Sequence, residues 1–514
     1  MFGLKVRELA VWIAYSVMLG VVVPWHEPWS DESQAWLLAR DLSIRQLLFH
    51  NLRYESHPAL WYLILWGPSH LHMNYAVLGW ISATIAAAGI YVLLRFSPFP
   101  FYLRAILPFT FFLAYQYAVV ARSYVLFPLL CFLIAHIYRQ VRPRPVLMAV
   151  LLALLANVSV HGTLVACTLA AVYSWNLYRR GRTAELTSRT LASAAVIFTL
   201  SIVFVAITIY PPNDLQIKAP PIVSRVIHSL SIPPTPDAPT QDQSAAPHAS
   251  QLLAAGATTT PQLSQKNHLA AHLADIPRVL TYAVSTSHIL TFFLYLLVVV
   301  YLFSRKQLLL LAPLAILTLF LEFIYAREWH LGLLWIVLLM TLWAAWDAGT
   351  NSRRLNLQNA LAAVLALVSL LQLPWTWNAI RYDIHSQYWG SKQAAAYIHT
   401  LPPGLRVAGF GTEPIAPYFS KHIFYNQPST AFVLHSAHND IFDDDAETIE
   451  TYPDVAVFWS GETASIDIAR SSGYHETHRF CGKIFLPNVE TEVGCYIFLE
   501  PSGRPAPRLP KSIP

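Results

Sequence analysis

The chain has 514 residues, of which 55% are hydrophobic and only 12% are charged, and its mean hydropathy is +0.43. This composition excludes an ordinary water-soluble globular protein and predicts that most of the chain is helical and lies in lipid. The formal net charge of +5 comes from Lys and Arg in short loops between apolar runs. It therefore bears on topology and on contact with anionic membrane lipid, and it does not indicate a nucleic-acid partner.

The apolar runs predict an all-α polytopic membrane bundle over residues 1–378, with about eleven spanning helices. The first run, Leu9–Trp25, follows two basic residues and precedes no small-residue cleavage site, so we expect an uncleaved span with a cytoplasmic N-terminus. If all basic loops are cytoplasmic, the run Val146–Tyr178 must cross twice, turning near residues 157–162, and Ala59–Leu71 is a half-helix. The other expected spans are Asn74–Leu94, Phe101–Val120, Tyr124–Tyr138, Thr190–Tyr210, Leu280–Phe303, Leu308–Tyr325, His330–Trp346 and Leu357–Trp377.

Two further segments are expected outside the membrane, on the side away from the cytoplasm. Residues 211–277 are rich in Pro, Ala, Ser, Thr and Gln, which predicts a long mobile loop. Residues 379–514 carry more charge and contain short apolar runs, which predict the strands of a small extracytoplasmic α/β domain. The runs are LRVAGFG, HIFYN, DVAVFW, KIFLP and CYIFLEP. Cys481 and Cys495 flank a turn-like stretch between the last two, so we expect them to pair across a hairpin in an oxidising compartment.

The first outside loop, residues 26–58, concentrates polar residues in a chain that has few. Ser30 is expected to cap a helix whose apolar face, Ala35, Leu38, Ala39 and Leu42, lies on the membrane surface. Ser43 is expected to cap a second short helix, and His57 and Pro58 lead back into the membrane.

Asp31 and Glu32 occupy the first turn of that first loop helix, at the boundary between water and lipid. Acidic residues in a first turn also complement the helix dipole, and this simpler explanation stays open. Nearby tryptophans have two explanations as well, because they either anchor the chain at the interface or offer faces for sugar stacking. These are Trp25, Trp29 and Trp36.

An acidic pair after the first span, two interfacial helices and a His-Pro before an apolar helix resemble the GT-C superfamily of membrane glycosyltransferases. The pattern is similar to the protein O-mannosyltransferases and to the bacterial aminoarabinose and sugar transferases that use polyprenyl-phosphate donors. The matching residues are Asp31, Glu32, His57, Pro58 and Leu60, with Ala59 where the family pattern has a second Pro. The stretch ARSYVLFPLL resembles the family's Ser-Arg-Tyr segment in altered order and places Arg122 and Tyr124 near the site. The resemblance covers about Leu4–Trp377 and does not extend closely to the tail.

The resemblance implies transfer of a sugar from a polyprenyl-phosphate donor to an acceptor hydroxyl at the outer membrane face, with inversion. Such a donor already has a good leaving group, so the enzyme must activate the acceptor and stabilise charge on the departing phosphate. We expect Asp31 to be the base, and Glu32 to hold Asp31, bind the sugar or share a divalent cation, Mg²⁺ or Mn²⁺, with it. The substrate-binding candidates are His57, Arg53, Arg122, Tyr124, Arg327 and His330.

Structural explanations compete with several of these roles. Arg122 lies near the outer end of a span and could simply snorkel, and the Arg327–His330 group could form an internal ion pair. His161, at the expected outer turn, fits a structural histidine better than a ligand. His50 and His57 lack the helical register of a zinc pair because Pro58 interrupts it, so no zinc site is predicted.

Two other classes of protein remain open: a transporter or lipid flippase, and a noncatalytic membrane scaffold whose outside domain binds a partner. The cytoplasmic loops contain no Asp-x-Asp and no Gly-rich phosphate loop, which disfavours a nucleotide-sugar donor. We expect a multi-pass protein of a bacterial inner (plasma) membrane. Whether the acceptor is a glycan, a lipid or a protein, and which sugar is moved, is not encoded in any motif found.

Overall fold

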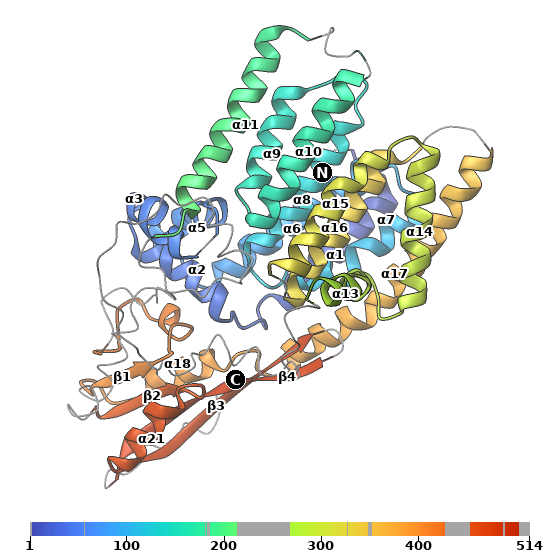
Figure 1. Cartoon of the computed structure of the whole chain (residues 1–514). Helices are drawn as coiled ribbons and strands as arrows, with labels where there is room; N and C mark the ends of the chain where they lie inside the picture. Colours follow the sequence, from blue (N-terminus) through green and yellow to red (C-terminus); the bar gives the residue numbers. More distant parts are fainter. Residues whose placement is uncertain are drawn as a thin grey trace.

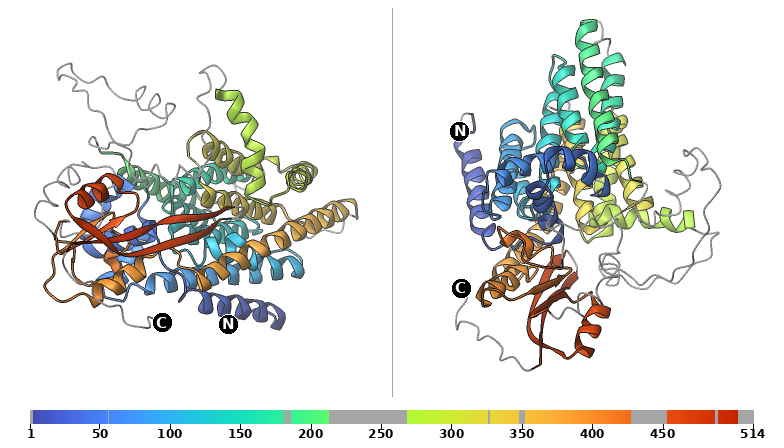
Figure 2. Two further views of the ribbon diagram at one scale, coloured as in Figure 1. Left: turned by 90° about the horizontal axis from the view of Figure 1, so that it is seen from below. Right: turned by 90° about the vertical axis from the view of Figure 1, so that its left-hand side faces the viewer.

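The computed structural model describes residues 3–55, 57–179, 181, 186–212, 268–325, 327–347, 352–426, 453–486 and 489–502. A body of helices carries a small sheet domain at one end, on the same side as the first loop helices (Figures 1 and 2). Most of the expected mobile loop, residues 211–277, lies outside the described residues. Its last part is helical, because α13 runs from His268 to Tyr282.

The helical body is built in chain order from short loop helices and longer apolar helices. The first part contains α1 (Val6–Val22), α2 (Ser30–Asp41), α3 (Ile44–Gln46), η1 (Leu47–Asn51), α4 (Leu52–Glu55), α5 (Leu60–His70), α6 (Val77–Phe96), α7 (Phe101–Ile106), η2 (Leu107–Phe109), η3 (Phe112–Gln116), η4 (Ser123–Val125) and α8 (Leu126–Tyr138). The second contains α9 (Pro145–Ala156), α10 (Val160–Arg179), α11 (Ser188–Ile209), α13, α14 (His288–Ser304), η7 (Leu308–Leu311), α15 (Ala312–Phe323), α16 (Glu328–Ala345) and α17 (Ser352–His385). The domain boundary expected at residue 378 falls inside α17.

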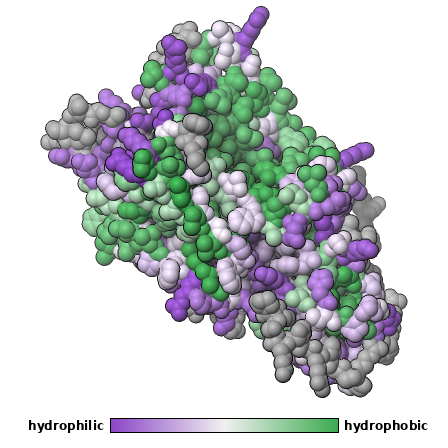
Figure 3. Space-filling view, turned by 180° about the vertical axis from the view of Figure 1, so that it is seen from behind, coloured by the Kyte–Doolittle hydropathy of each residue, from purple (hydrophilic) through white to green (hydrophobic). Residues whose placement is uncertain are grey.

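The chain is an integral membrane protein. Among the described residues, four helices are long and apolar enough to cross a membrane: α6, α11, α16 and residues Asn356–His385 of α17. Large apolar side chains that face outward on α11 and α14, among them Leu200 and Phe292, suit contact with lipid rather than water. Figure 3 shows hydrophobic side chains gathered over the helical part. The expected count of about eleven spans is not confirmed, because several of the other apolar helices are shorter.

Two expected spans are interrupted. The run Phe101–Val120 is divided into α7, η2 and η3, and Pro108 lies at the break, where it removes a backbone donor from the helix. The run Leu280–Phe303 is divided after Tyr282, and Ser287 then caps α14 by accepting a hydrogen bond from the Leu290 N–H. Helical hydrophobicity alone did not reveal either break.

The expected turn within Val146–Tyr178 is confirmed, since α9 ends at Ala156 and α10 begins at Val160. Gly162 allows the two helices to approach, because a Cβ added there would lie 2.2 Å from the Leu155 carbonyl oxygen. The half-helix expected at Ala59–Leu71 is α5, which at 11 residues is too short to span a bilayer.

The first loop differs from expectation at its first helix. The N-cap of α2 is Trp29 rather than Ser30, because the Glu32 carboxylate turns back and accepts the Trp29 N–H at 3.1 Å. The helix is also buried from Glu32 to Ala39, where a surface helix would have one exposed face. The cap of the second helix is as expected, since the Ser43 hydroxyl accepts the Gln46 N–H.

The C-terminal domain is a four-stranded sheet of β1 (Val407–Phe410), β2 (Val455–Trp459), β3 (Tyr474–Leu486) and β4 (Val489–Pro501), in the order β1-β2-β4-β3. Strands β1 and β2 are parallel and the other pairs antiparallel. The domain also contains α18 (Ser391–Thr400), η8 (Ala416–Tyr418) and α21 (Thr463–Ser471). The α/β domain is therefore as expected, except that HIFYN forms only one isolated bridge, Val407 to Phe424.

The expected disulfide is confirmed. Cys481 and Cys495 are directly opposite each other in the β3–β4 ladder and are bonded. The bond closes the long hairpin that forms one edge of the sheet. Such a bond persists in an oxidising compartment.

We expect Cys495→Ser to destabilise the C-terminal domain by about 3 kcal/mol, because the bond closes a short loop of the unfolded chain. Limited proteolysis of the detergent-solubilised protein over a temperature series measures this. Cys167→Ser, at an exposed free cysteine in α10, is the control. Equal resistance of the Cys495→Ser and wild-type domains would contradict the expectation.

Candidate active site

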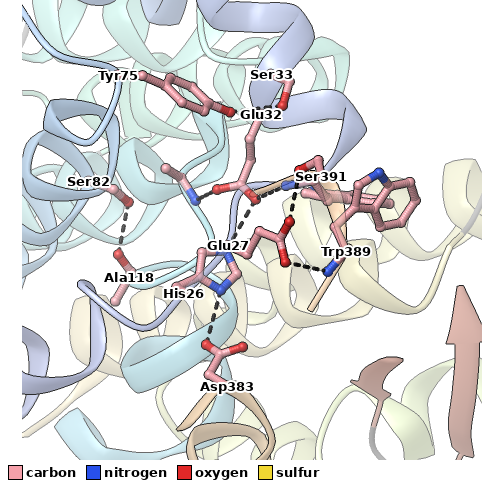
Figure 4. Close-up of polar contacts among 12 residues, drawn as sticks. His26, Glu27, Glu32, Ser33, Tyr75, Ser82, Ala118, Asp383, Trp389 and Ser391 are labelled. Carbon is pink, nitrogen blue, oxygen red and sulfur yellow. Dashed lines mark hydrogen bonds and ion pairs between the residues drawn. The ribbon is translucent and has the colours of Figure 1, made fainter. Parts of the chain in front are cut away.

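Glu27 joins the first loop to the C-terminal domain. Its carboxylate is buried and accepts four hydrogen bonds at the start of α18: from the N–H groups of Trp389 (3.1 Å), Gly390 (3.0 Å) and Lys392 (2.6 Å), and from the Ser391 hydroxyl (2.9 Å) (Figure 4). The first turn of a helix has free N–H groups and a positive dipole end, so a carboxylate is favoured there.

His26, the preceding residue, lies between two buried carboxylates (Figure 4). Its Nε2 is 3.2 Å from Glu32 Oε2, and its Nδ1 is 3.0 Å from Asp383 Oδ2 near the end of α17. Burial lowers the pKa of the imidazole, but the charges of Asp383 and Glu32 outweigh it and raise the pKa of His26 to about 10. His26 is therefore an imidazolium at neutral pH and compensates the negative charge around it.

Glu32 is fully buried, and both of its oxygens are bonded. Oε1 accepts the Ala121 N–H, and Oε2 receives both the Trp29 N–H and the contact with His26. The carboxylate thus fixes the start of α2 and the residue immediately before Arg122. This placement favours an anchoring role for Glu32 over the expected contact with the sugar or with a metal ion.

Asp31, one residue earlier, faces the other way. Its Oδ2 is 2.7 Å from Nη2 of Arg122, and its side chain is 38% exposed, whereas that of Arg122 is 12% exposed. The guanidinium lies over the rings of Trp29 (5.5 Å) and Trp329 (5.7 Å), and also over Tyr124 at 5.3 Å. The structure therefore pairs Asp31, the expected base, with Arg122, one of the residues expected to bind the phosphate. Of the two side chains, that of Asp31 is the more exposed.

His57 belongs to the same neighbourhood. Its Nδ1 donates to the Glu55 carbonyl oxygen at 2.7 Å, which leaves Nε2 as the acceptor. Burial and the nearby Arg122 charge lower the pKa of His57, although Glu55 and Asp31 oppose the shift. A neutral imidazole thus lies beside the Asp31–Arg122 pair at neutral pH.

Tyr124 and His330, both expected at the site, contact each other with ring centroids 5.5 Å apart. His161 completes this cluster, 4.6 Å from His330 and 6.2 Å from Tyr124. Sequence reasoning favoured a structural role for His161. Yet it is 5% exposed, and neither ring nitrogen has a hydrogen-bond partner among the described residues. The only sequence signal was its position in the turn between two apolar runs.

The two remaining candidates have other partners. Arg53 donates to the carbonyl oxygens of Tyr210 and Pro211 at the end of α11, and no described hydrogen bond or ion pair joins it to Asp31 or Arg122. Arg327 caps α16: its N–H donates to His330 Nδ1 at 3.2 Å. Its guanidinium lies 6.0 Å from the centre of the Tyr325 ring. Arg327 is therefore adjacent to the cluster of Tyr124, His161 and His330. Arg53 instead connects the first loop to the end of α11.

The donor set does not favour a metal at Asp31 and Glu32. The Glu32 oxygens are occupied by hydrogen bonds, and one Asp31 oxygen is paired with Arg122. Within the described ranges, no three His, Cys, Asp or Glu side chains are arranged to hold a metal ion.

The imidazolium of His26 predicts a pH dependence of stability. The pKa of His26 is higher in the folded protein, about 10, than its ordinary 6.5, so its contribution is complete below pH 6.5 and is lost as pH rises towards 10. We expect the Tm of the purified protein to fall over this interval and the fall to be shallower in His26→Gln. His385→Gln, at an exposed histidine in the same helix as Asp383, is the control. Parallel curves for wild type and His26→Gln would contradict this assignment.

Comparison with known proteins shows the fold. No family model and no curated protein matches the chain. The chain is similar to the crystal structure of ArnT from Cupriavidus metallidurans bound to undecaprenyl phosphate, with 10% identity, 97% of this chain and 99% of that chain covered, and a TM-score of 0.50. The apo ArnT structure has the same identity and coverage and a TM-score of 0.49. The expected likeness to a bacterial sugar transferase is thereby confirmed at the level of the fold, which is that of ArnT.

Proposed function

We propose that this protein is a membrane glycosyltransferase that moves a sugar from a polyprenyl-phosphate donor to an acceptor hydroxyl. The observation that carries the proposal is the ion pair of a half-exposed carboxylate, Asp31, with a mostly buried guanidinium, Arg122, at 2.7 Å. The fold supports it, because a protein of the same fold binds undecaprenyl phosphate. The negative charge suits activation of the acceptor hydroxyl, and the positive charge suits stabilisation of the departing phosphate.

Asp31 acts as the general base. Its exposed side reaches the acceptor, and the carboxylate accepts the hydroxyl proton as the oxygen attacks the anomeric carbon. The bond from that carbon to the phosphate oxygen breaks in the same displacement, so the product has inverted configuration.

Arg122 stabilises the departing phosphate. A guanidinium remains charged at any physiological pH and donates in a fixed fork that matches phosphate oxygens. Its stacking against aromatic rings, described above, holds it in place before the substrate arrives. Little reorganisation is then needed as negative charge develops. Tyr124, His57 and His330 surround this position, and Glu32 fixes the backbone on which Asp31 and Arg122 stand.

We place the protein in the inner membrane of a bacterium, with its N-terminus in the cytoplasm. The first loop and the C-terminal domain then lie on the side of the membrane away from the cytoplasm. The disulfide supports this side, since such bonds persist in oxidising compartments. The contact of Glu27 with α18 supports a common side for the loop and the domain. Residues 1–378 would be the transferase bundle and residues 379–514 the outside domain.

We expect Asp31→Asn to lower sugar transfer by about 100-fold or more, because the isosteric amide cannot accept the proton. Proteoliposomes without an ion gradient, supplied with lipid-linked sugars extracted from bacterial membranes, allow release of undecaprenyl phosphate to be followed by mass spectrometry. Asp41→Asn, at an acidic residue at the other end of α2, should remain active. Full activity of Asp31→Asn would refute the proposed base.

Chelation tests the metal alternative. Because both Glu32 oxygens already accept hydrogen bonds inside the protein, we expect EDTA to change the transfer rate by less than about twofold. A loss of activity that Mg²⁺ or Mn²⁺ restores would instead establish a divalent cation at this site.

A further inference from the structure

Several buried hydrogen-bond donors around Arg122 have no partner among the described residues. They are Nη1 of Arg122 itself, Nε1 of Trp29, Nε1 of Trp329 and the N–H of the His161 imidazole, whose second ring nitrogen, an acceptor in the neutral ring, is also unpartnered. The Trp29 and Trp329 rings are 5.2 Å apart, and both flank the guanidinium. A buried polar group without a partner is destabilising, so several in one place call for a ligand rich in acceptor oxygens.

The donors in this cluster are mostly uncharged. The indoles are neutral, and the charge of Arg122 is already matched by Asp31 at 2.7 Å. His57 is kept neutral by burial and by the same guanidinium. A further cation among the described residues, Arg327, lies against Tyr325 at the edge of the cluster. The site therefore offers many hydrogen bonds but little uncompensated positive charge.

Phosphodiesters and phosphomonoesters differ in the negative charge that a binding site must neutralise. A phosphodiester, as in a lipid-linked sugar, carries one negative charge, whereas a phosphomonoester carries about −1.5 to −2 at neutral pH. A second charge would face the Asp31 carboxylate, because the buried cations found here within the described ranges, Arg122 and His26, are already paired with carboxylates.

We propose that the cluster of Arg122, Trp29, Trp329 and His161 selects monoanionic phosphodiesters over the free carrier phosphate. The inference rests on the proposed function and adds a means of expelling the product. When the acceptor oxygen bonds to the anomeric carbon, the electron pair of the broken bond stays on the phosphate and the hydroxyl proton moves to Asp31. The neutral acid tolerates the new dianion. Once Asp31 loses that proton to water, its charge repels the carrier phosphate.

The experiment compares three probes at pH 8 with purified full-length protein in nanodiscs: undecaprenyl phosphate, its methyl phosphodiester and undecaprenol. Competition against a fluorescent lipid phosphate measures each Kd. We expect the methyl diester to bind about tenfold more tightly than undecaprenyl phosphate, which corresponds to one moderate charge repulsion. Asp31→Asn mimics the neutral acid, so it should remove the preference by strengthening the binding of undecaprenyl phosphate.

A second variant tests the neutral donors. His161→Phe keeps the ring and removes its nitrogens, so it should weaken binding of both phosphate lipids and leave that of undecaprenol unchanged. The matched control is His136→Phe in the last turn of α8, where the imidazole contacts Gln140.

The outcomes separate the two proposals. If wild type binds undecaprenyl phosphate as tightly as the diester, or if Asp31→Asn preserves a preference for the diester, the selection is wrong while the proposed function stands. If neither phosphate lipid binds better than undecaprenol, the proposed function fails and the selection fails with it. Should His161→Phe not fold, the wild-type and Asp31→Asn ratios still decide.

Discussion

The buried carboxylates of the first loop set the constraint on which this site depends. Glu27 and Glu32 lie at the junction of the helical body and the C-terminal domain, where an unpaired charge would be costly. Glu27 is stabilised by the first turn of α18, and Glu32 by His26, Trp29 and Ala121. These contacts fix the start of α2 and the segment before Arg122. Asp31, one residue before Glu32, and Arg122, one residue after Ala121, are consequently held close to each other.

The two neighbouring acids thus have opposite environments despite adjacent positions. Glu32 is sealed from solvent with its oxygens satisfied, and Asp31 has an exposed face and a single cationic partner. The Glu32 oxygens are engaged inside the protein and have no face towards a substrate, whereas the exposed face of Asp31 can accept a proton from one. We assign proton transfer to Asp31 for this reason, whereas Glu32 holds the backbone segments that carry Asp31 and Arg122.

Local signals in the sequence were sufficient for part of this arrangement. The cap at Ser43, the turn before Val160 and the Cys481–Cys495 bond all depend on residues close in sequence or on one simple pairing. The role of Glu32 was not accessible, because its partner Ala121 is 89 residues away and contributes only a backbone N–H, which every residue but proline has. The unpartnered nitrogens of His161 were not predictable either, because whether a buried histidine finds hydrogen-bond partners depends on residues that are distant in the sequence. The interruptions near Pro108 and Tyr282 show that apolar composition fixes neither the length nor the continuity of a span.

The contact of Glu27 with α18 also limits how the protein can move. If the sheet domain swung away as a hinged lid, four donors would be withdrawn from a carboxylate in a poorly solvated place. Such a motion would have to rehydrate that charge, which makes it expensive. Shorter versions of the chain that end before Trp389 would lack all four donors permanently, so the helical body and the C-terminal domain behave as a single mechanical unit.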